Sequence, residues 1–491
     1  MENKIRQIDN MKQGLLNLIS EIEQAPDKQN RLGEVEVHIF SSLMIIGKQL
    51  IQYYIGLVKL KTKKTSRDGH LEGCQNKGLF KRSYFSIFGQ ISFIRPKYYF
   101  PGGKHVLFPL DRALGIPKGI YSYVLQDWIG YSATDTDYRS SVSLLNRILG
   151  HDISGMQSER IANTLSGSVG AFYEEGVTGE KEECEFFAGG FDDKGIPIKA
   201  SEVNRKVDSN GARLGKGQKR GVKKSSTVSV TYSFKRFVRK PEDIISSLFK
   251  EGTSGGNSAG PAEPRQWAKN KHVRAFLTDK AKAIGYGFEN ILQRCGETKK
   301  GIVVLIDGDR GLEKAIDRVM ANKKIEDRIA AKILDFIHVT EYVWKAANAR
   351  YGEKSTKRLD WVKEQCLLLL KSQLGTVVEN LQGSIEKTKG KPTKQEAIQK
   401  VINYFLNHEH MMDYQLYLDR GFPISTGAVE SACGHFVQNR MERNGMHWSL
   451  KGAQNILDLR AANKNNDWDN YLKYHINKEQ EKYSCEYKMA A

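Results

Sequence analysis

Three acidic residues at widely spaced positions could hold divalent metal ions. Asp192 and Asp307 each follow a run of residues typical of a β-strand, and Glu430 lies in the first turns of a predicted helix. Metal-dependent cleavage of phosphodiesters needs carboxylates that converge on hard cations. More than a hundred residues separate each acid from the next, so the fold must bring three elements together. The pattern predicts a Mg²⁺ or Mn²⁺ site.

Spacing alone makes this a weak signal, because the chain has 57 acidic residues and they offer many such sets. An Asp before a Gly, as at Asp307, is also an ordinary turn residue. Two further acids, Asp193 and Asp309, stand close enough in sequence to take the place of Asp192 or Asp307.

The charge of the chain indicates a polyanionic partner. Lys and Arg number 76 against 57 Asp and Glu, for a formal charge of +19, and such a protein attracts nucleic acid through counterion release and steering. A basic protein without such a ligand is the alternative. The six cysteines include no Cys-x-x-Cys pair, which fits a reducing cytosol. Because no signal peptide or apolar run of the ~20 residues of a membrane span is found, we expect a cytoplasmic protein, associated with the nucleoid if bacterial.

Apolar residues at helical spacing predict a mainly helical region over residues 1–175, with a small hairpin over residues 80–99 that turns at Gly89-Gln90. Helical units with a short ribbon and a basic surface are a common way to reach DNA, although they also simply fill a domain. We expect this region to bind DNA.

Strand patterns predict an α/β region over residues 182–340. The segment around Asp192 is typical of strand, tight turn and strand, and residues 301–307 form an apolar run typical of a covered central strand. Residues 333–338 predict another strand, after which Thr340 would cap a helix. A helix is also predicted over residues 275–292.

The chain after residue 340 begins with a long stretch that is helical by pattern. Residues 341–419 form a helical insertion, residues 420–465 return to the α/β region with the helix of Glu430, and residues 466–491 form a C-terminal tail. Asn444-Gly445 is the expected end of the Glu430 helix.

Several cations and one aromatic residue are candidates for DNA contact. A basic, Gly-rich segment over residues 213–224 could neutralise phosphates, or it could be a solvated hairpin tip. Trp448 could stack a displaced base, whereas a lone Trp is more often a core residue. The other candidates are Lys219, Arg220, Lys223, Lys224, Arg440 and Arg443.

The sequences around the three acids resemble the ISKra group of bacterial insertion-sequence transposases, which are of the DDE type. The resemblance is carried by FDDKGIPI, VVLIDGDRGL and GFPISTGAVESACGHFVQNRMERNGMHW, followed by GAQNILDLRA. It covers roughly residues 184–465 and more loosely reaches FPLDRALGIP. It implies an RNase H-like fold that holds an Asp, Asp, Glu triad, with a helical insertion between the second Asp and the Glu.

The resemblance carries over to single residues. Asp192 matches the family's first Asp, and Asp193 stands where the family pattern has Gly. Asp307 matches the second Asp and leaves Asp309 as a spare acid. Around Glu430 the match is close, but Gly434 stands where a Lys is expected, which removes one phosphate contact.

The resemblance also bears on zinc and on His338. Residues 98–103 lack the cysteine pair that the family often has there, so a zinc site is not expected. Asp335 and His338 resemble an Asp/Cys-x-x-His element of related transposases. Residues three apart on a strand point to opposite faces, so both could reach one ion only if the strand ended between them. His338 is either a hydrogen-bonding residue beside the site or a structural histidine.

The implied function is Mg²⁺-dependent cleavage of the element ends, after which the freed 3′-hydroxyl attacks target DNA. The implied partner is double-stranded DNA, both the terminal inverted repeats and the target, bound by a homo-oligomer. The alternatives are a transposase-derived DNA-binding protein without activity and an RNase H-like nuclease without strand transfer. An intact triad argues against the first alternative.

Overall fold

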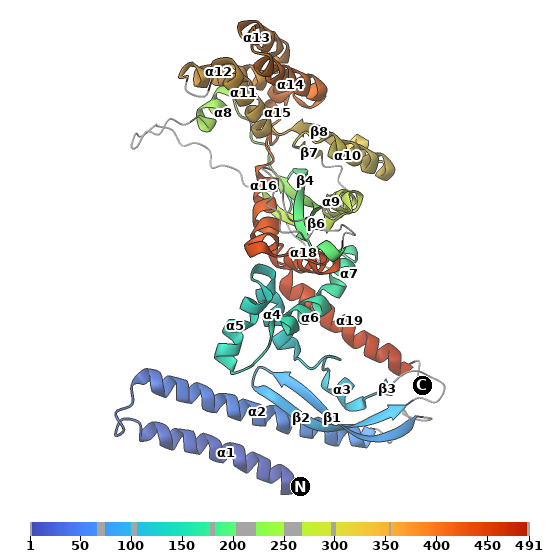
Figure 1. Cartoon of the computed structure of the whole chain (residues 1–491). Coiled ribbons are helices and arrows are strands. Elements are labelled where there is room, and N and C mark those ends of the chain that lie inside the picture. Colours follow the sequence, from blue (N-terminus) through green and yellow to red (C-terminus); the bar gives the residue numbers. More distant parts are fainter. Residues whose placement is uncertain are drawn as a thin grey trace. The chain divides into compact units, whose positions relative to one another are not determined.

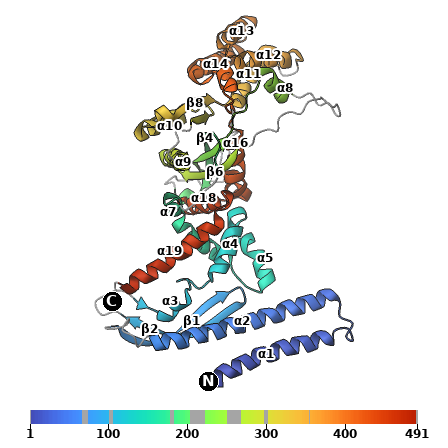
Figure 2. The same ribbon diagram turned by 180° about the vertical axis from the view of Figure 1, so that it is seen from behind.

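The computed structural model describes residues 2–65, 74–99, 106–176, 182–202, 222–249, 268–295, 301–352 and 355–488. The chain divides into two compact units, Met1–Val177 with Asn466–Ala491, and Thr178–Asn465 (Figures 1 and 2). Within the described ranges no helix is both long enough and apolar enough to cross a membrane.

The first unit is helical apart from a small sheet, as the sequence predicts. In both views α1 and α2 lie side by side (Figures 1 and 2), and Glu21 of α1 pairs with His38 of α2 at 2.7 Å. The helices are α1 (Glu2–Glu23), α2 (Leu32–Thr65), α3 (Pro109–Leu114), α4 (Tyr123–Asp135), α5 (Tyr138–Leu149), α6 (Gly155–Leu165), η1 (Ser166–Ser168), α7 (Val169–Glu174) and α19 (Trp468–Lys488).

The sheet of this unit contains the predicted hairpin. β1 (Gln75–Ser86), β2 (Gly89–Tyr99) and β3 (Val106–Leu107) pair in that order, and both pairings are antiparallel. Ser86 pairs with Gly89, so the turn is Ile87-Phe88 and not Gly89-Gln90. Gly89 has a φ of 101°, a conformation that favours glycine.

The C-terminal tail contains the helix α19 (Trp468–Lys488). Its α19 packs on α4 and α7, and the indole nitrogen of Trp468 donates a hydrogen bond to Asp127 at 2.7 Å.

The second unit contains a five-stranded mixed sheet in the order β6-β5-β4-β7-β8. The first three strands in this order are antiparallel, and β7 and β8 continue from β4 in parallel. The strands are β4 (Phe186–Ile198), β5 (Val222–Phe234), β6 (Lys269–Leu277), β7 (Ile302–Ile306) and β8 (Ile329–Leu334).

Three predictions for this sheet were wrong. β4 has no turn after Asp192, because it pairs without interruption with β5 from Phe186 to Ile198. Residues 269–277 form β6, whereas a helix was expected from residue 275. β8 ends at Leu334, and the carboxylate of Asp335 caps the next helix by accepting the Ile337 amide at 2.9 Å.

Helices cover both faces of the sheet. Successive residues of β4 point to opposite faces. Phe191 contacts Phe288 of α9 with ring centroids 5.6 Å apart, and Gly190 lies against Val429 of α16. The helices of this part are η2 (Ala200–Glu202), α8 (Pro241–Leu248), α9 (Lys280–Cys295), α10 (Arg310–Lys323) and η3 (Glu326–Arg328).

A helical segment separates β8 from the helix of Glu430, and its described residues contain no strand. It comprises α11 (Phe336–Tyr351), α12 (Lys357–Leu370), α13 (Leu374–Lys387), α14 (Pro392–His408), η4 (Glu409–Met411) and α15 (Tyr414–Asp419). The chain then returns to the sheet through α16 (Gly427–Ala432), the π-helical turn η5 (Cys433–Gln438), α17 (Asn439–Met441), η6 (Arg443–Gly445) and α18 (Leu450–Lys464).

Candidate functional site

Asp192 and Asp307 lie on neighbouring parallel strands. The pairing of β4 with β7 ends at Gly190 and Leu305, and each acid stands two residues beyond its member of this last pair. Asp192 remains inside the β4–β5 pairing, opposite Val228, whereas Asp307 directly follows β7. The two acids therefore occupy equivalent positions at the point where β4 and β7 separate.

The neighbouring acids have structural partners of their own. Asp193 accepts a hydrogen bond from Thr227 and pairs with Lys280 at 2.7 Å, and the alternation of β4 directs it away from the face of Asp192. Asp309 caps α10 by accepting the Leu312 amide at 2.6 Å. Asp192 and Asp307 also have partners, since Asp192 pairs with Lys194 at 3.3 Å and Asp307 accepts the Asp309 amide at 3.0 Å, but neither of them caps a helix, as Asp309 does.

Glu430 reaches the sheet because α16 approaches β4 very closely. A Cβ atom added at Gly190 would lie 2.2 Å from Cγ2 of Val429, so only glycine fits there. Val429, Ala432 and Phe436, which follow one another at helical spacing, are buried. After Ala432 the helix widens into the π-helical turn η5, an irregularity often found at functional sites.

Asp335 and His338 lie beside Glu430. Because β8 ends at Leu334, these two residues occupy the first turn of α11 and not one strand, and His338 Nδ1 lies 3.1 Å from Asp335. Asp335 is fully buried and also accepts a hydrogen bond from Thr426. Thr426 in turn donates to Glu430 at 3.3 Å, and His338 lies 3.8 Å from the same carboxylate oxygen.

The group of described residues whose ligand atoms all lie within 4.8 Å of one another is Asp335, His338 and Glu430. Asp192, Asp307 and Glu430 do not form such a group among the residues that the structure describes. The carboxylate of Glu430 is directed toward Thr426 and His338, and Asp192 pairs with Lys194 at 3.3 Å. The expected triad therefore converges less tightly than ligands of a shared metal pair would.

Neighbouring charges shift the pKa of several groups in this region. Burial raises the pKa of Asp307, and the nearby charge of Asp192 adds to this. Burial and the charge of Asp335 raise the pKa of Glu430. Although burial opposes it, the charge of Asp192, 3.3 Å away, and that of Glu430 raise the pKa of Lys194.

His338 carries a positive charge in this cluster, whereas Cys433 is neutral. The hydrogen bond to Asp335 raises the pKa of His338 to about 9, so the ring is a cation at neutral pH. Burial raises the pKa of Cys433, which hydrogen-bonds Asp192 as a neutral thiol.

Sequence reasoning did not single out Lys194, Thr426 or Cys433. Lys194 lies in the same matched block as Asp192, and Thr426 and Cys433 flank Glu430. These three residues could have been found from the sequence only through their positions in the blocks that carry the resemblance.

Two of the candidates for DNA contact are buried in the structure. Arg440 is 1% exposed and Trp448 is 7% exposed. The guanidinium lies 4.8 Å from the Trp448 ring, whose nitrogen donates to the Met441 carbonyl. In this arrangement neither side chain reaches DNA, because both are enclosed by their own unit. Trp448 is the core residue that was the alternative reading.

The remaining cations stay candidates. Arg443 and Lys223 are exposed, Lys224 is partly exposed, and Lys223 pairs with Glu442 at 3.0 Å. Lys219 and Arg220 lie outside the described residues.

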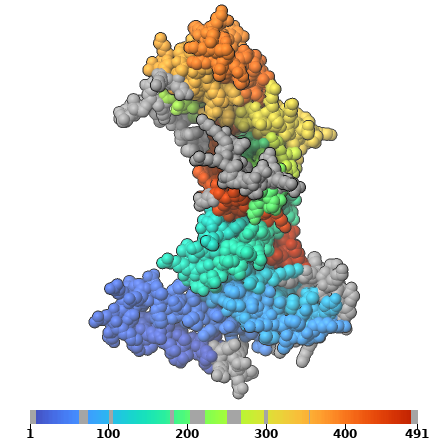
Figure 3. Space-filling view, in the orientation of Figure 1, coloured from blue at the N-terminus to red at the C-terminus, as the bar shows by residue number. Residues whose placement is uncertain are grey.

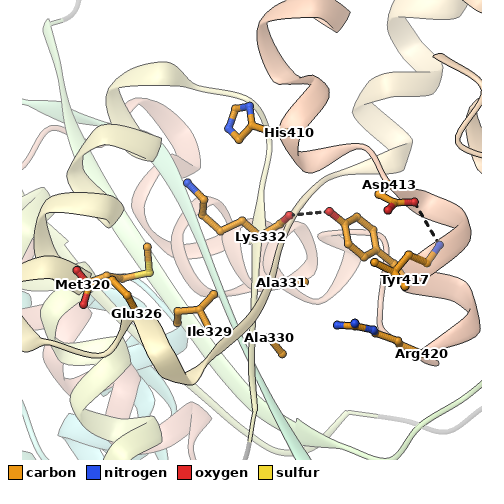
Figure 4. Close-up of a pocket in the computed structure, with 11 residues that line it drawn as sticks. Met320, Glu326, Ile329, Ala330, Ala331, Lys332, His410, Asp413, Tyr417 and Arg420 are labelled. Carbon is orange, nitrogen blue, oxygen red and sulfur yellow. Dashed lines mark hydrogen bonds between the residues drawn. The ribbon is translucent and has the colours of Figure 1, made fainter. Parts of the chain in front are cut away.

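A pocket opens at the edge of the sheet, away from these acids. It is lined by residues of β8 and by side chains around α10 and α15, among them Lys332, His410, Asp413 and Arg420 (Figure 4). The hydroxyl of Tyr417 donates to the Lys332 carbonyl on the strand edge. None of the candidate site residues lines it.

The comparisons with known proteins give one distant relative and no activity. The chain is 22% identical over 474 residues to the protein named "UPF0236 protein in vanSb 3'region" from Streptococcus gallolyticus, an alignment that covers 93% of this chain and 88% of that protein. No family model matches the chain. The similarity is therefore a distant homology along nearly the full length of both proteins.

Proposed function

We propose that the chain is a DDE-type DNA transposase with an RNase H-like catalytic core. The observation that carries the proposal is that three elements place Asp192, Asp307 and Glu430 around the end of the β4–β7 pair, although their carboxylates do not converge as a metal pair would require. Asp192 and Asp307 stand at matching positions on these strands, and α16 packs on β4 at Gly190 with Glu430 next to the contact residue Val429.

The sheet supports the RNase H-like assignment. The mixed five-stranded sheet in the order β6-β5-β4-β7-β8, with helices on both faces, is compatible with the RNase H-like core that the resemblance implies. The helical segment α11–α15 stands between the second Asp and the Glu, where the resemblance implies an insertion. The net charge of +19 suits a protein that holds DNA.

The donor set fits Mg²⁺ or Mn²⁺. Asp192, Asp307 and Glu430 offer carboxylate oxygens, the ligands that hard divalent cations prefer. Lys194 already places a positive charge close to Asp192, which indicates that this space favours a cation. When bound, such ions activate the attacking hydroxyl and stabilise charge on the scissile phosphate.

The surrounding residues position these acids. Asp335 holds Thr426 and His338, and both contact the carboxylate of Glu430. His338 is a cation beside the site and lies near Asp307, where it can offset the negative charge of a DNA phosphate. Lys194 must release Asp192 for that carboxylate to ligate an ion.

The test is a cleavage and joining assay with labelled element-end DNA, with and without Mg²⁺. We expect Asp192→Asn to abolish both products, and Asp193→Asn to retain them because its side chain is engaged on the other face of β4. Equal loss in both variants would remove Asp192 from the proposed role.

Glu430→Gln separates chemistry from binding. We expect it to abolish cleavage while DNA affinity in a gel-shift titration stays equal or rises, because one negative charge near the phosphates is removed. Cleavage at the wild-type rate would show that Glu430 is not a ligand. Cutting without joining would indicate a nuclease, and binding without cutting in the wild type would indicate an inactive relative of a transposase.

A further inference from the structure

Two buried arginines anchor the ribbon of β1 and β2 to the first unit. Arg82 donates hydrogen bonds to three successive carbonyls of residues 117–119, and Arg95 pairs with the buried carboxylate of Asp111. The first seven residues of β1, Gln75–Lys81, are in contrast all exposed. We call these seven residues and the residues opposite them on β2, 94–99, the outer ribbon, which lies at the surface in light blue in Figure 3.

Both faces of the outer ribbon carry large exposed side chains. Leu79 and Phe80 follow each other on β1, so their side chains point to opposite faces of the sheet, and they are 70% and 41% exposed. On β2, Ile94 pairs with Lys81 and is 42% exposed. A sheet that only covers a core hides one of its two faces. The outer ribbon is therefore suited to contact a partner on two sides.

The outward charges of the ribbon are all positive. β1 and β2 contain five Lys and Arg residues and no Asp or Glu. Two of the five are the inward arginines, and the other three are Lys77, Lys81 and Lys97. Within the part of the chain that the structure describes, none of these three ammonium groups pairs with a carboxylate, whereas Lys280 and Lys332 do. Uncompensated positive charge of this kind attracts a polyanion.

Lys81 and Lys97 lie on opposite faces of the outer ribbon. Lys81 stands two residues after Leu79 on β1 and therefore lies on the same face as Leu79. The ammonium of Lys97 lies 4.8 Å from the centre of the Phe80 ring, which places it on the other face. A partner that touches both faces would meet a positive charge on each of them.

We propose that the outer ribbon enters the major groove of double-stranded DNA, where Lys81 and Lys97 contact phosphates on the two sides of the groove. The major groove is about 12 Å wide and admits a two-stranded ribbon. Phosphates border it on both sides, which matches lysines on both faces. Leu79 would then contact thymine methyl groups. The inference rests on the proposed function, because it names the part of the chain that holds the DNA substrate.

The aromatic residues of the outer ribbon favour a duplex over a single strand. Lys97 covers one face of the Phe80 ring, and the ammonium of Lys77 lies 5.9 Å from the centre of the Tyr99 ring. Proteins that hold single strands stack unpaired bases on open aromatic faces. Rings that already carry an ammonium on one face offer less surface for such stacking.

The first test is the salt dependence of DNA binding by the full chain, followed by fluorescence anisotropy of a labelled element-end duplex. The double variant Lys81→Gln, Lys97→Gln loses two phosphate contacts. We expect the slope of log Kd against log salt to fall by about 1.8, and Kd at roughly 0.1 M salt to rise at least about tenfold. The matched control is Lys12→Gln, Lys28→Gln, which removes the same charge from exposed positions in and just after α1 and should keep the wild-type slope.

The outcomes separate this inference from the proposed function. A wild-type slope in the ribbon variant, or an equal change in the control, would overturn the inference alone, since the wild-type chain still binds DNA. A wild-type chain that binds no duplex would overturn both. Tighter wild-type binding to the single strand than to the duplex, with the preference lost in the ribbon variant, would refute the groove. Circular dichroism checks that each variant is folded.

The second test asks whether the ribbon lies in the major groove. Guanine N7 faces that groove, so the wild-type chain at saturation should protect a set of guanines from methylation by dimethyl sulfate. The double variant, also at saturation, should leave part of this set exposed. Leu79→Ala should weaken binding without changing the salt slope, because its side chain carries no charge. If the wild type and the double variant protect the same guanines, the ribbon does not lie in the major groove.

Discussion

The contact between Gly190 and Val429 makes Gly190→Ala the sharpest structural test of the site. The new Cβ would lie 2.2 Å from Cγ2 of Val429, more than 1 Å short of the roughly 3.5–4.0 Å at which two carbons attract. A valine in a helix has essentially one χ1 rotamer, so the side chain cannot rotate away at low cost. α16 must therefore move away from β4.

Two effects should follow from this displacement. Overpacking of this kind lowers the free energy of unfolding by about 1–3 kcal/mol. Because Glu430 follows Val429 directly, the same movement shifts its carboxylate, and a misplacement of about 1 Å can reduce catalysis by roughly 10²-fold. The stability is measured by urea unfolding and the cleavage rate on labelled element ends.

Gly189→Ala is the matched control. Gly189 points to the opposite face of β4, where a Cβ atom would lie 3.3 Å from Ile291, a contact that a small shift relieves. We expect a smaller change in stability and little change in cleavage. Adding Val429→Ala to Gly190→Ala removes the clashing methyl group and should recover part of both losses. Equal stability and cleavage in the Gly190 and Gly189 variants would refute the close-packing argument.

Three further predictions concern residues around the site. Asp309→Ala should lower the free energy of unfolding by about 1 kcal/mol, because α10 loses its N-terminal cap. Its cleavage activity should remain, whereas Asp307→Asn should abolish cleavage. Loss of activity in both variants would make Asp309 a metal ligand. Asp335→Asn should lower the pKa of His338 from about 9, as followed by NMR titration. Because the pKa of His338 is raised on folding, its contribution to the free energy of unfolding is complete below pH 6.5 and is lost as the pH rises through about 9. The variant should lose this dependence of stability on pH. An unchanged midpoint in the NMR titration of His338 would contradict the role of Asp335 in raising its pKa. Trp448→Ala should destabilise the fold by about 3–5 kcal/mol without weakening DNA binding per folded molecule, and a selective loss of binding would restore its role in stacking.

Elements with local signals could be predicted from the sequence. The apolar run before Asp307 is the buried strand β7, and the periodic stretch after β8 is helical from α11 to α15. Both patterns depend on residues close in sequence, since a strand covered on two faces needs only a short apolar run.

Elements fixed by distant partners could not be predicted. Gly195 and Pro197 suggest a turn after Asp192, yet both residues pair with β5, because that neighbour continues along the whole length of β4. The strand β6 is rich in charge, including Arg274, which pairs with Asp458 of α18 at 3.0 Å. The partner that buries this charge is remote in sequence, so the local pattern resembled a helix start.

The same reasoning explains which part of the candidate site was missed. The three acids lie in recognisable blocks, but the residues that orient them act through pairs formed only in the fold. Thr426 and Asp335 are 91 positions apart in the sequence, so although Asp335 and His338 were recognised as a motif, their link to Glu430 through Thr426 could not be.

The position of Glu430 depends on two contacts of different kinds. On one side Val429 packs into the space that Gly190 leaves on β4, which fixes how close α16 comes to the sheet. On the other side buried Asp335 holds Thr426 at the start of α16, which ties the helix to the end of β8 and the beginning of the helical segment. Because Asp335 is also the cap of α11, a movement of that segment would reach Glu430 through a single buried carboxylate. The helical segment is therefore joined to the candidate site by hydrogen bonds as well as by the chain.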